Sequence, residues 1–324
     1  MEACNFRGVS SSRSIASNLR VPSISRQRSP PSCISWTFHS VLPKISVTAR
    51  RTSTRPRKIE VRSQSSMAAS AKSKGRVQVF DSEEAQAVYL AKYTADLSEK
   101  FVKEKGSFTV VVSGGSLINS LRKLAESPYV DSVDWSKWHI FWVDERVVPK
   151  DHPDSNYKLA YDALLSKVTI PSENVHAIND KLSAEAAAED YETVLRDLVK
   201  IKVLNISETT GFPKFDAMLL GMGPDGHLAS LFPGHPLVNE NKKWVTFITD
   251  SPKPPSDRIT FTFPVINSSA NVSLVICGAG KAPIVKVALG EEGEKNGDLL
   301  PVQMVSLDEG ELNWFLDKEA ASKL

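Results

Sequence analysis

The sequence contains only three cysteines in 324 residues, and two of them, Cys4 and Cys33, lie in its first 66 residues. Because Cys277 then stands alone, the rest of the chain has neither a disulfide framework nor a cysteine-rich metal site. Cys277 ends the apolar run 272–277, which predicts a buried small hydrophobe. Long apolar runs are also lacking, since none reaches the ~20 residues that cross a bilayer. The sequence therefore predicts no membrane partner.

Acidic residues are almost missing from residues 1–66. This segment has twelve Lys/Arg and sixteen serines but only two acids, Glu2 and Glu60, so its net charge is +10. A segment rich in serine and arginine, poor in acids and without a long apolar core is typical of an organelle transit peptide. We predict that residues 1–66 form a disordered transit peptide, and the serine content favours a plastid over a mitochondrion. The alternative is a basic arm that binds nucleic acid or a membrane.

Residues 67–324 carry a net charge of −8, because the whole chain carries only +2. An acidic body has no electrostatic footprint for DNA or RNA, so we expect no nucleic-acid partner, and any bound anion needs a local pocket. Met67 lies at the composition boundary and could start a shorter, cytosolic product. The final Ser322-Lys323-Leu324 matches a peroxisomal address, with a frayed helix end as the alternative. Nothing in the composition indicates an oligomeric state.

Apolar runs alternate with amphipathic segments from residue 77 onward. The expected strands are 77–80, 108–112, 138–143, 175–178, 215–220, 244–248, 257–263, 272–277 and 301–305. The expected helices are 83–105, capped by Ser82, then 117–125, a helix capped by Ser155 or Asn156 that runs to about 165, and 183–202, 283–289 and 312–315. This alternation predicts one α/β domain over 67–324 with a doubly wound, mainly parallel sheet.

Four of these strands are followed by polar loops: 113–116, 144–146, 221–227 and 278–281. The carboxyl ends of parallel strands share one edge of a sheet, so the loops are expected to line one crevice. Each loop alone has an ordinary alternative: a Gly-Gly turn, a salt-bridged loop after residue 143, or an Asp225 that caps a short helix beginning near His227. No Gly-x-Ser-x-Gly elbow and no metal-ligand spacing is present.

The motifs together resemble the 6-phosphogluconolactonase family. They occur in the family's order from residue 77 to the end: Ser113-Gly114-Gly115-Ser116, Asp144-Glu145-Arg146, Ser155-Asn156, Gly221-Met222-Gly223-Pro224-Asp225-Gly226-His227 with Ala229-Ser230-Leu231-Phe232-Pro233, Arg258-Ile259-Thr260 and Gly278-x-x-Lys281-Ala282. The related glucosamine-6-phosphate deaminases are similar over the glycine and Asp-Gly-His loops but continue with an acidic Asn-Glu-Pro type ending. Residues 229–233 contain no carboxylate, which favours the lactonase.

The resemblance implies a modified Rossmann-like, three-layer fold and the hydrolysis of 6-phospho-D-glucono-1,5-lactone in the oxidative pentose phosphate pathway. It implies no metal, nucleotide or other cofactor, and the presequence suggests a plant plastid form. The alternatives are an amino-sugar-6-phosphate deaminase or isomerase, which would release ammonia, and a non-catalytic sugar-phosphate sensor, which could have lost His227.

Lactone hydrolysis requires an activated water, an oxyanion stabiliser and a hold on the distant phosphate. His227 suits the general base because imidazole titrates near neutrality. Asp225 is expected to orient its ring or to cap a helix. Arg146 is a candidate to stabilise the developing charge or to serve phosphate or structure, and Asp144 to hold a sugar hydroxyl or position Arg146. The expected phosphate and substrate ligands are Ser113, Gly114, Gly115, Ser116, Asn156, Arg258 and Lys281.

Overall fold

The computed structural model describes residues 75–290 and 299–324. The predicted transit peptide and Met67 lie outside the described residues. Within them, no helix is both long and apolar enough to cross a membrane.

A seven-stranded sheet forms the centre of the molecule, and all its pairings are parallel. Its order is β1 (Arg76–Phe80), β12 (Glu311–Asp317), β11 (Asn271–Ile276), β8 (Ala217–Leu220), β2 (Phe108–Val112), β3 (Trp138–Trp142) and β5 (Val175–His176). β2, β8 and β11 are buried along their whole length because both faces of the sheet are covered. The predicted parallel α/β class is confirmed.

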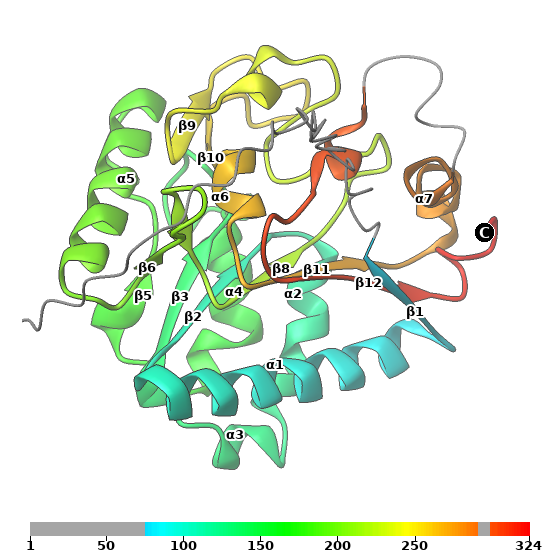
Figure 1. The fold of residues 1–324 in the computed structure, drawn as a ribbon, viewed down its shortest axis with the longest axis horizontal. Coiled ribbons are helices and arrows are strands. Elements are labelled where there is room, and N and C mark those ends of the chain that lie inside the picture. The colour runs from blue at the N-terminus through cyan, green and yellow to red at the C-terminus, as the bar shows by residue number, and fades with distance from the viewer. Residues whose placement is uncertain (1–74, 291–298) are drawn as a thin grey trace, which may run out of the picture. The chain divides into compact units, whose positions relative to one another are not determined.

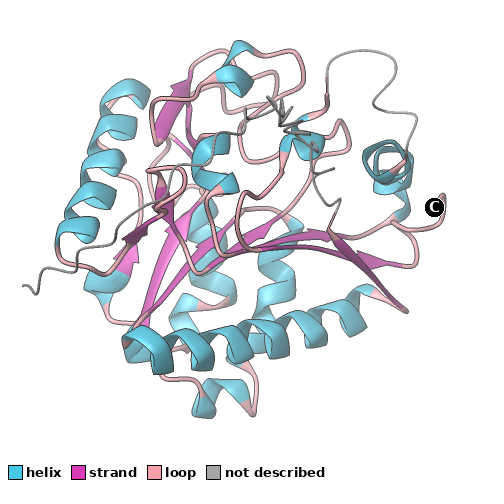
Figure 2. Cartoon of the chain, viewed as in Figure 1, coloured by secondary structure: helices cyan, strands magenta, loops and turns pink. Residues whose placement is uncertain are grey.

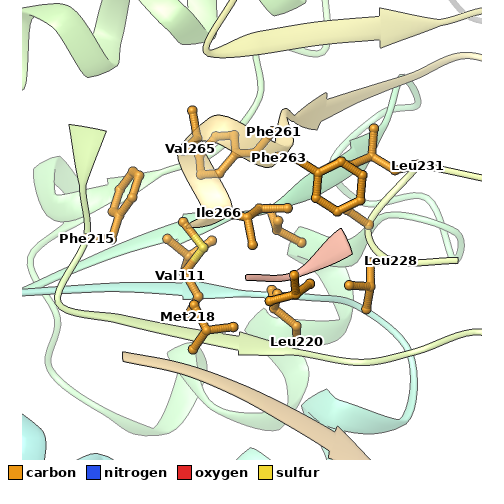
Figure 3. Close-up of a cluster of buried hydrophobic side chains, with 14 of the residues drawn as sticks. Val111, Phe215, Met218, Leu220, Leu228, Leu231, Phe261, Phe263, Val265 and Ile266 are labelled. Carbon is orange, nitrogen blue, oxygen red and sulfur yellow. The ribbon is translucent and has the colours of Figure 1, made fainter. Parts of the chain in front are cut away.

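Helices cover both faces of the sheet, which gives the three layers (Figures 1 and 2). One face packs against α1 (Glu83–Lys105), α2 (Ser116–Leu121), α3 (Tyr129–Ser132) and α4 (Asn156–Ala163). The other packs against α5 (Ala184–Lys200), α6 (Phe263–Asn267) and α7 (Ala282–Leu289). Figure 3 shows part of the second core, where Val111 and Met218 of the sheet meet Phe261 and Ile266.

A small antiparallel sheet lies in the same layer as α5 and α6. It consists of β4 (Asp144–Arg146), β10 (Arg258–Phe261) and β9 (Val245–Ile248), with β10 in the middle. The β4–β10 register places Arg146 opposite Arg258 and Asp144 opposite Thr260. β6 (Asn205–Ile206) and β7 (Pro213–Lys214) form a separate two-stranded antiparallel sheet. The 3-10 helices are Arg122–Ala125, Trp135–Lys137, Leu165–Lys167, Ser172–Asn174, Pro236–Asn239, Ala279–Lys281 and Pro301–Met304.

The helix ends follow the capping residues of the sequence. The Ser82 hydroxyl accepts from the Ala85 N–H at 3.1 Å, and Gly106 ends α1 with φ +83°. Ser155, not Asn156, caps α4, where its hydroxyl accepts from the Lys158 N–H at 3.2 Å. Both long helices, α1 and α5, lie where the sequence predicts them.

Five local predictions are wrong. Residues 301–304 form a 3-10 helix, because Pro301 sits at its first turn, and 311–317 form the strand β12 instead of a helix. No helix follows His227, since residues 228–231 fold back in a tight turn closed by a Leu228–Leu231 bridge. Residues 144–146 are a strand, not a loop. Cys277 lies one residue beyond β11 and is half-buried, with its thiol 2.6 Å from Oε1 of Gln86.

Candidate active site

A cavity of about 320 Å³ opens at the carboxyl edge of the parallel sheet. All four predicted loops contribute to it, as the convergence of parallel strands requires. Every predicted site residue except Asp225 lines it: Ser113, Gly114, Gly115, Ser116, Asp144, Arg146, Asn156, His227, Arg258 and Lys281. Lys253 lines it as well, so four cationic side chains face one carboxylate, that of Asp144. This surplus of positive charge suits an anionic ligand.

The glycine loop lies between β2 and α2, and steric reasons favour glycine at both of its glycine positions. Gly115 has φ +67°, which favours glycine. A Cβ on Gly114 would lie 1.8 Å from Oδ1 of Asn156. Oγ of Ser113 and Oδ1 of Asn156 are buried and have no hydrogen-bond partner in the described part of the chain, which leaves both for a ligand. The helix after the loop has only six residues before it tightens to 3-10, so its dipole is smaller than a helix over 117–125 would supply.

The alternation of β4 separates its three charged residues. Asp144 and Arg146 line the cavity, while the buried Glu145 between them faces the start of α4. There it accepts the N–H groups of Arg146 and Asn156 at 2.8 Å and of Tyr157 at 2.7 Å. Burial raises the pKa of Glu145 to about 7, and these backbone donors oppose the shift. Glu145 therefore ties β4 to α4, and with it Arg146 to Asn156.

Replacing Glu145 by glutamine is expected to destabilise the protein by about 1–3 kcal/mol, because the new amide NH₂ would face backbone N–H donors and leave them unpaired. Thermal or urea unfolding measures the loss. Glu173→Gln on the exposed surface is the matched control, with no change expected. Equal stability of the two variants would contradict this role of Glu145.

Asp144 is fixed by contacts from two other elements. Its Oδ2 accepts from the Ser230 hydroxyl at 2.8 Å, and its carbonyl accepts from Nδ2 of Asn156 at 3.0 Å. The backbone N–H of Ser230 in turn donates to Oγ1 of Thr260 at 3.3 Å. Ser230 lies in the tight turn where Ala229 has φ +51°. These contacts hold the Asp144 side chain in place at the cavity wall.

His227 and Asp225 form a close pair on the loop after β8. Nδ1 of His227 lies 2.5 Å from Oδ1 of Asp225, and the ring packs on Phe232 at 4.8 Å between centroids. Gly226 turns the loop with φ +80°, and the Gly223 N–H donates to the His227 carbonyl at 2.9 Å. Nε2 has no hydrogen bond within the described residues, so the pair leaves this nitrogen for a ligand. The geometry places Asp225 beside the imidazole and not on a helix end.

The pKa values of the pair follow from burial and contact. Burial lowers the pKa of His227, and the Asp225 carboxylate opposes that shift. Partial burial works to raise the pKa of Asp225, but the hydrogen bond with His227 and the Lys253 ammonium lower it to about 2. At neutral pH the site therefore holds an ionised carboxylate against an imidazole that is ready to accept a proton.

Arg258 and Lys281 reach the cavity, but both are engaged with backbone carbonyls. Arg258 donates from Nε to Pro255 at 2.9 Å and from Nη2 to Lys253 at 2.8 Å and Pro254 at 3.0 Å. Lys281 donates to the Met222 carbonyl. Burial lowers the pKa of Arg258, and Arg146 across the strand pair adds to the shift. Arg258 therefore also holds the backbone of residues 253–255, a structural role that the sequence did not indicate.

Three residues at or next to this cavity were missed by the sequence prediction: Lys253, Glu145 and Ser230. Lys253 stands in the segment 252–255, which its prolines mark only as a rigid loop. Glu145 and Ser230 stand inside recognised motifs, but their partners come from other elements. Among the described residues, no group of three or more His, Cys, Asp or Glu side chains is arranged to hold a metal ion.

Comparison with known proteins gives consistent relatives. Residues 81–314 match the family described as glucosamine-6-phosphate isomerases/6-phosphogluconolactonase. Probable chloroplastic 6-phosphogluconolactonase 4 of Oryza sativa subsp. indica is 69% identical over 248 residues, 76% of each chain. Chloroplastic 6-phosphogluconolactonase 3 of Arabidopsis thaliana is 69% identical over 251 residues, 78% of this chain and 76% of that one. The crystal structure of a 6-phosphogluconolactonase from Thermotoga maritima superimposes with a TM-score of 0.63 at 31% identity, over 75% of this chain and 99% of that one.

Proposed function

Because this chain belongs to the family of glucosamine-6-phosphate isomerases and 6-phosphogluconolactonases, we propose that it hydrolyses 6-phospho-D-glucono-1,5-lactone to 6-phosphogluconate, the second step of the oxidative pentose phosphate pathway. The observation that carries the proposal is the His227 imidazole, paired with Asp225, at the wall of a cavity lined by four cations. A base beside an anion-binding surface is what hydrolysis of a phosphorylated lactone requires.

His227 acts as the general base in this proposal. Nδ1–H donates to Asp225, so Nε2 is left to take a proton from water as the water oxygen attacks the lactone carbonyl. The carbonyl π electrons move to oxygen, and Arg146 is positioned to stabilise this oxyanion. Collapse of the intermediate breaks the bond to the ring oxygen, which takes the proton back from Nε2 and becomes a hydroxyl. The new carboxylic acid loses its proton to solvent.

The phosphate is held in this proposal by a second set of cavity-lining residues, the phosphate wall. Lys281, the glycine loop 113–116 and the Ser113 hydroxyl supply donors, and Asn156 supports the loop through its contact with Gly114. Arg258 adds positive charge within the wall. Binding the phosphate away from the reacting bond fixes the carbonyl near His227, so binding energy is used for orientation.

The turn after His227 supports a lactonase over an amino-sugar deaminase. Residues 229–233 contain no carboxylate, and Ser230 instead donates to Asp144. A monomeric glucosamine-6-phosphate deaminase has the same fold, with a TM-score of 0.59 at 20% identity. A likeness at this identity shows the fold alone and does not bear on the reaction.

We further propose plastid import through residues 1–66 and a catalytic domain over residues 67–324. The chloroplastic relatives and the basic, serine-rich composition support this location. The exposed Ser322-Lys323-Leu324 supports a peroxisomal pool, and Met67 a shorter cytosolic form. Fractionation with sequencing of the amino termini tests this: a single terminus in every compartment would contradict two products.

The direct test is hydrolysis of freshly made 6-phosphogluconolactone by the whole chain. Acid release should exceed the fast uncatalysed rate in proportion to enzyme concentration, and glucosamine 6-phosphate should yield no ammonia. Ammonia release would establish the deaminase instead, and binding of 6-phosphogluconate without either reaction would establish a sensor.

A further inference from the structure

Lys253 contacts both members of the catalytic pair. Its Nζ lies 3.1 Å from Oδ1 and 3.1 Å from Oδ2 of Asp225, and 3.1 Å from Nδ1 of His227. The ammonium therefore lies on the Nδ1 side of the imidazole and not on the Nε2 side. No other lysine of the described chain contacts this pair.

The backbone around Lys253 is held rigidly for a surface loop. Pro252, Pro254 and Pro255 fix the φ angles on both sides. The Lys253 carbonyl accepts from the Ser251 hydroxyl at 2.8 Å and from Nη2 of Arg258 at 2.8 Å. Arg258 also binds the next two carbonyls and is itself buried in β10. Because Arg258 belongs to β10, its hydrogen bonds to these carbonyls fix the backbone of Lys253 relative to β10.

We propose that Lys253 is a positioning residue of the hydrolytic site, which holds the Asp225 carboxylate against Nδ1 of His227 and is itself anchored by Arg258 through the proline loop. This inference rests on the proposed hydrolysis and assigns a group that serves it. In consequence, Arg258 acts on the base through Lys253 in addition to facing the cavity.

The proton positions follow from charge. Lysine can only donate, and so can the N–H form of Nδ1, so the two share Asp225 as their common acceptor. If Lys253 donated to Nδ1 instead, the lone pair of Nδ1 would face the Asp225 carboxylate at 2.5 Å, which is repulsive. The arrangement therefore places the proton on Nδ1 and leaves Nε2 as the acceptor for water.

The charge of Lys253 also opposes protonation of the imidazole. The charged groups that most affect the pKa of His227 are Asp225 on its own loop, Lys253 on the proline loop and Asp144 on β4; Arg146, Arg258 and Lys281 line the same cavity. Burial disfavours the imidazolium most, both acids favour it, and the Lys253 charge disfavours it. Lys253→Met removes this opposition and leaves the Asp225 charge unshared, so both effects raise the pKa of His227.

The test compares Lys253→Met with two other lysines in the whole chain. For Lys253→Met, the acidic limb of kcat/KM should move to higher pH by about one unit, with kcat falling more than KM rises. Lys253→Arg keeps the charge and should leave the limb in place. Lys281→Met, at the proposed phosphate wall, should raise KM about tenfold without moving the limb. Lys242→Met on the exposed surface should change neither.

A measurement without turnover separates this inference from the proposed function. The chain has six histidines, and the signal lost in His227→Ala identifies His227 in the NMR spectrum of the free protein. Its titration midpoint should rise by about one pH unit in Lys253→Met, whatever substrate the enzyme takes. Thermal midpoints of the variants verify folding. An unmoved His227 titration, or a KM increase like that of Lys281→Met with an unmoved pH limb, would overturn the proposal.

Discussion

His227→Ala is expected to lower kcat by about 10²–10⁴-fold, the usual contribution of a positioned general base. The variant loses Nε2, which is left unbonded by the described chain, while the cationic wall of the cavity remains. Binding of 6-phosphogluconate should therefore survive, with a Kd within a few-fold of the original. Initial rates corrected for spontaneous hydrolysis, together with calorimetric titration of the product, measure the two quantities.

His235→Ala provides the matched control for this experiment. His235 stands eight residues further along the chain, caps a 3-10 helix and does not line the cavity. Its loss should leave turnover unchanged. If His227→Ala kept its turnover, or lost turnover and product binding in the same proportion, His227 would not be the base.

Gly223→Ala is expected to have the second largest effect, although it removes no functional group. A Cβ at this position would lie 2.0 Å from Cε1 and Nδ1 of His227 and 2.5 Å from Oδ1 of Asp225. The imidazole must move by an ångström or more, and a displacement of that size can cost about 10²-fold in rate. We expect kcat to fall by roughly that factor while KM changes little, because the atoms nearest to the added Cβ belong to His227 and Asp225 and not to a proposed phosphate ligand. Steady-state kinetics checks both parameters.

Gly280→Ala is the control for Gly223→Ala. A Cβ on Gly280 has open space around it, and the residue lies in a 3-10 helix where alanine is tolerated. Its kinetics should match those of the unaltered chain. A Gly223→Ala enzyme with normal kcat would show that the pair tolerates displacement, and a crystal structure of that variant would locate the shifted ring.

The sequence predicted the parts of the fold whose pattern is local. α1 and α5 have a capping serine and an apolar stripe, and β2 and β11 are β-branched runs bounded by small residues. β12 was missed because its apolar residues are buried on both faces and so show no alternation, and a short apolar run does not by itself separate helix from strand. The turn after His227 was missed because, besides its local Leu228–Leu231 bridge, it is held by a hydrogen bond from the Ser230 N–H to Thr260, thirty residues away.

The candidate site was predictable where its residues follow parallel strands. Such loops meet at one edge whatever the connections between them, and the cavity contains all of them. Lys253 was not predictable, because it reaches the site from the small antiparallel sheet, whose position no local pattern encodes. For the same reason the sequence did not show that Arg146 and Arg258 are cross-strand neighbours.

The place of β12 in the sheet has a consequence for how the protein is made. β12 lies between β1 and β11, and the Gln86 side chain on α1 bonds carbonyls of both Ile276 and Phe315. During synthesis β1 is the first described strand to leave the ribosome, and its partner β12 is the last. β1 can therefore pair only after β12 has emerged. Until then the growing sheet keeps an open edge beside β11, a template for wrong pairing. Chaperones that hold the nascent chain until its final residues are released would therefore matter more here than for a protein with local strand pairs.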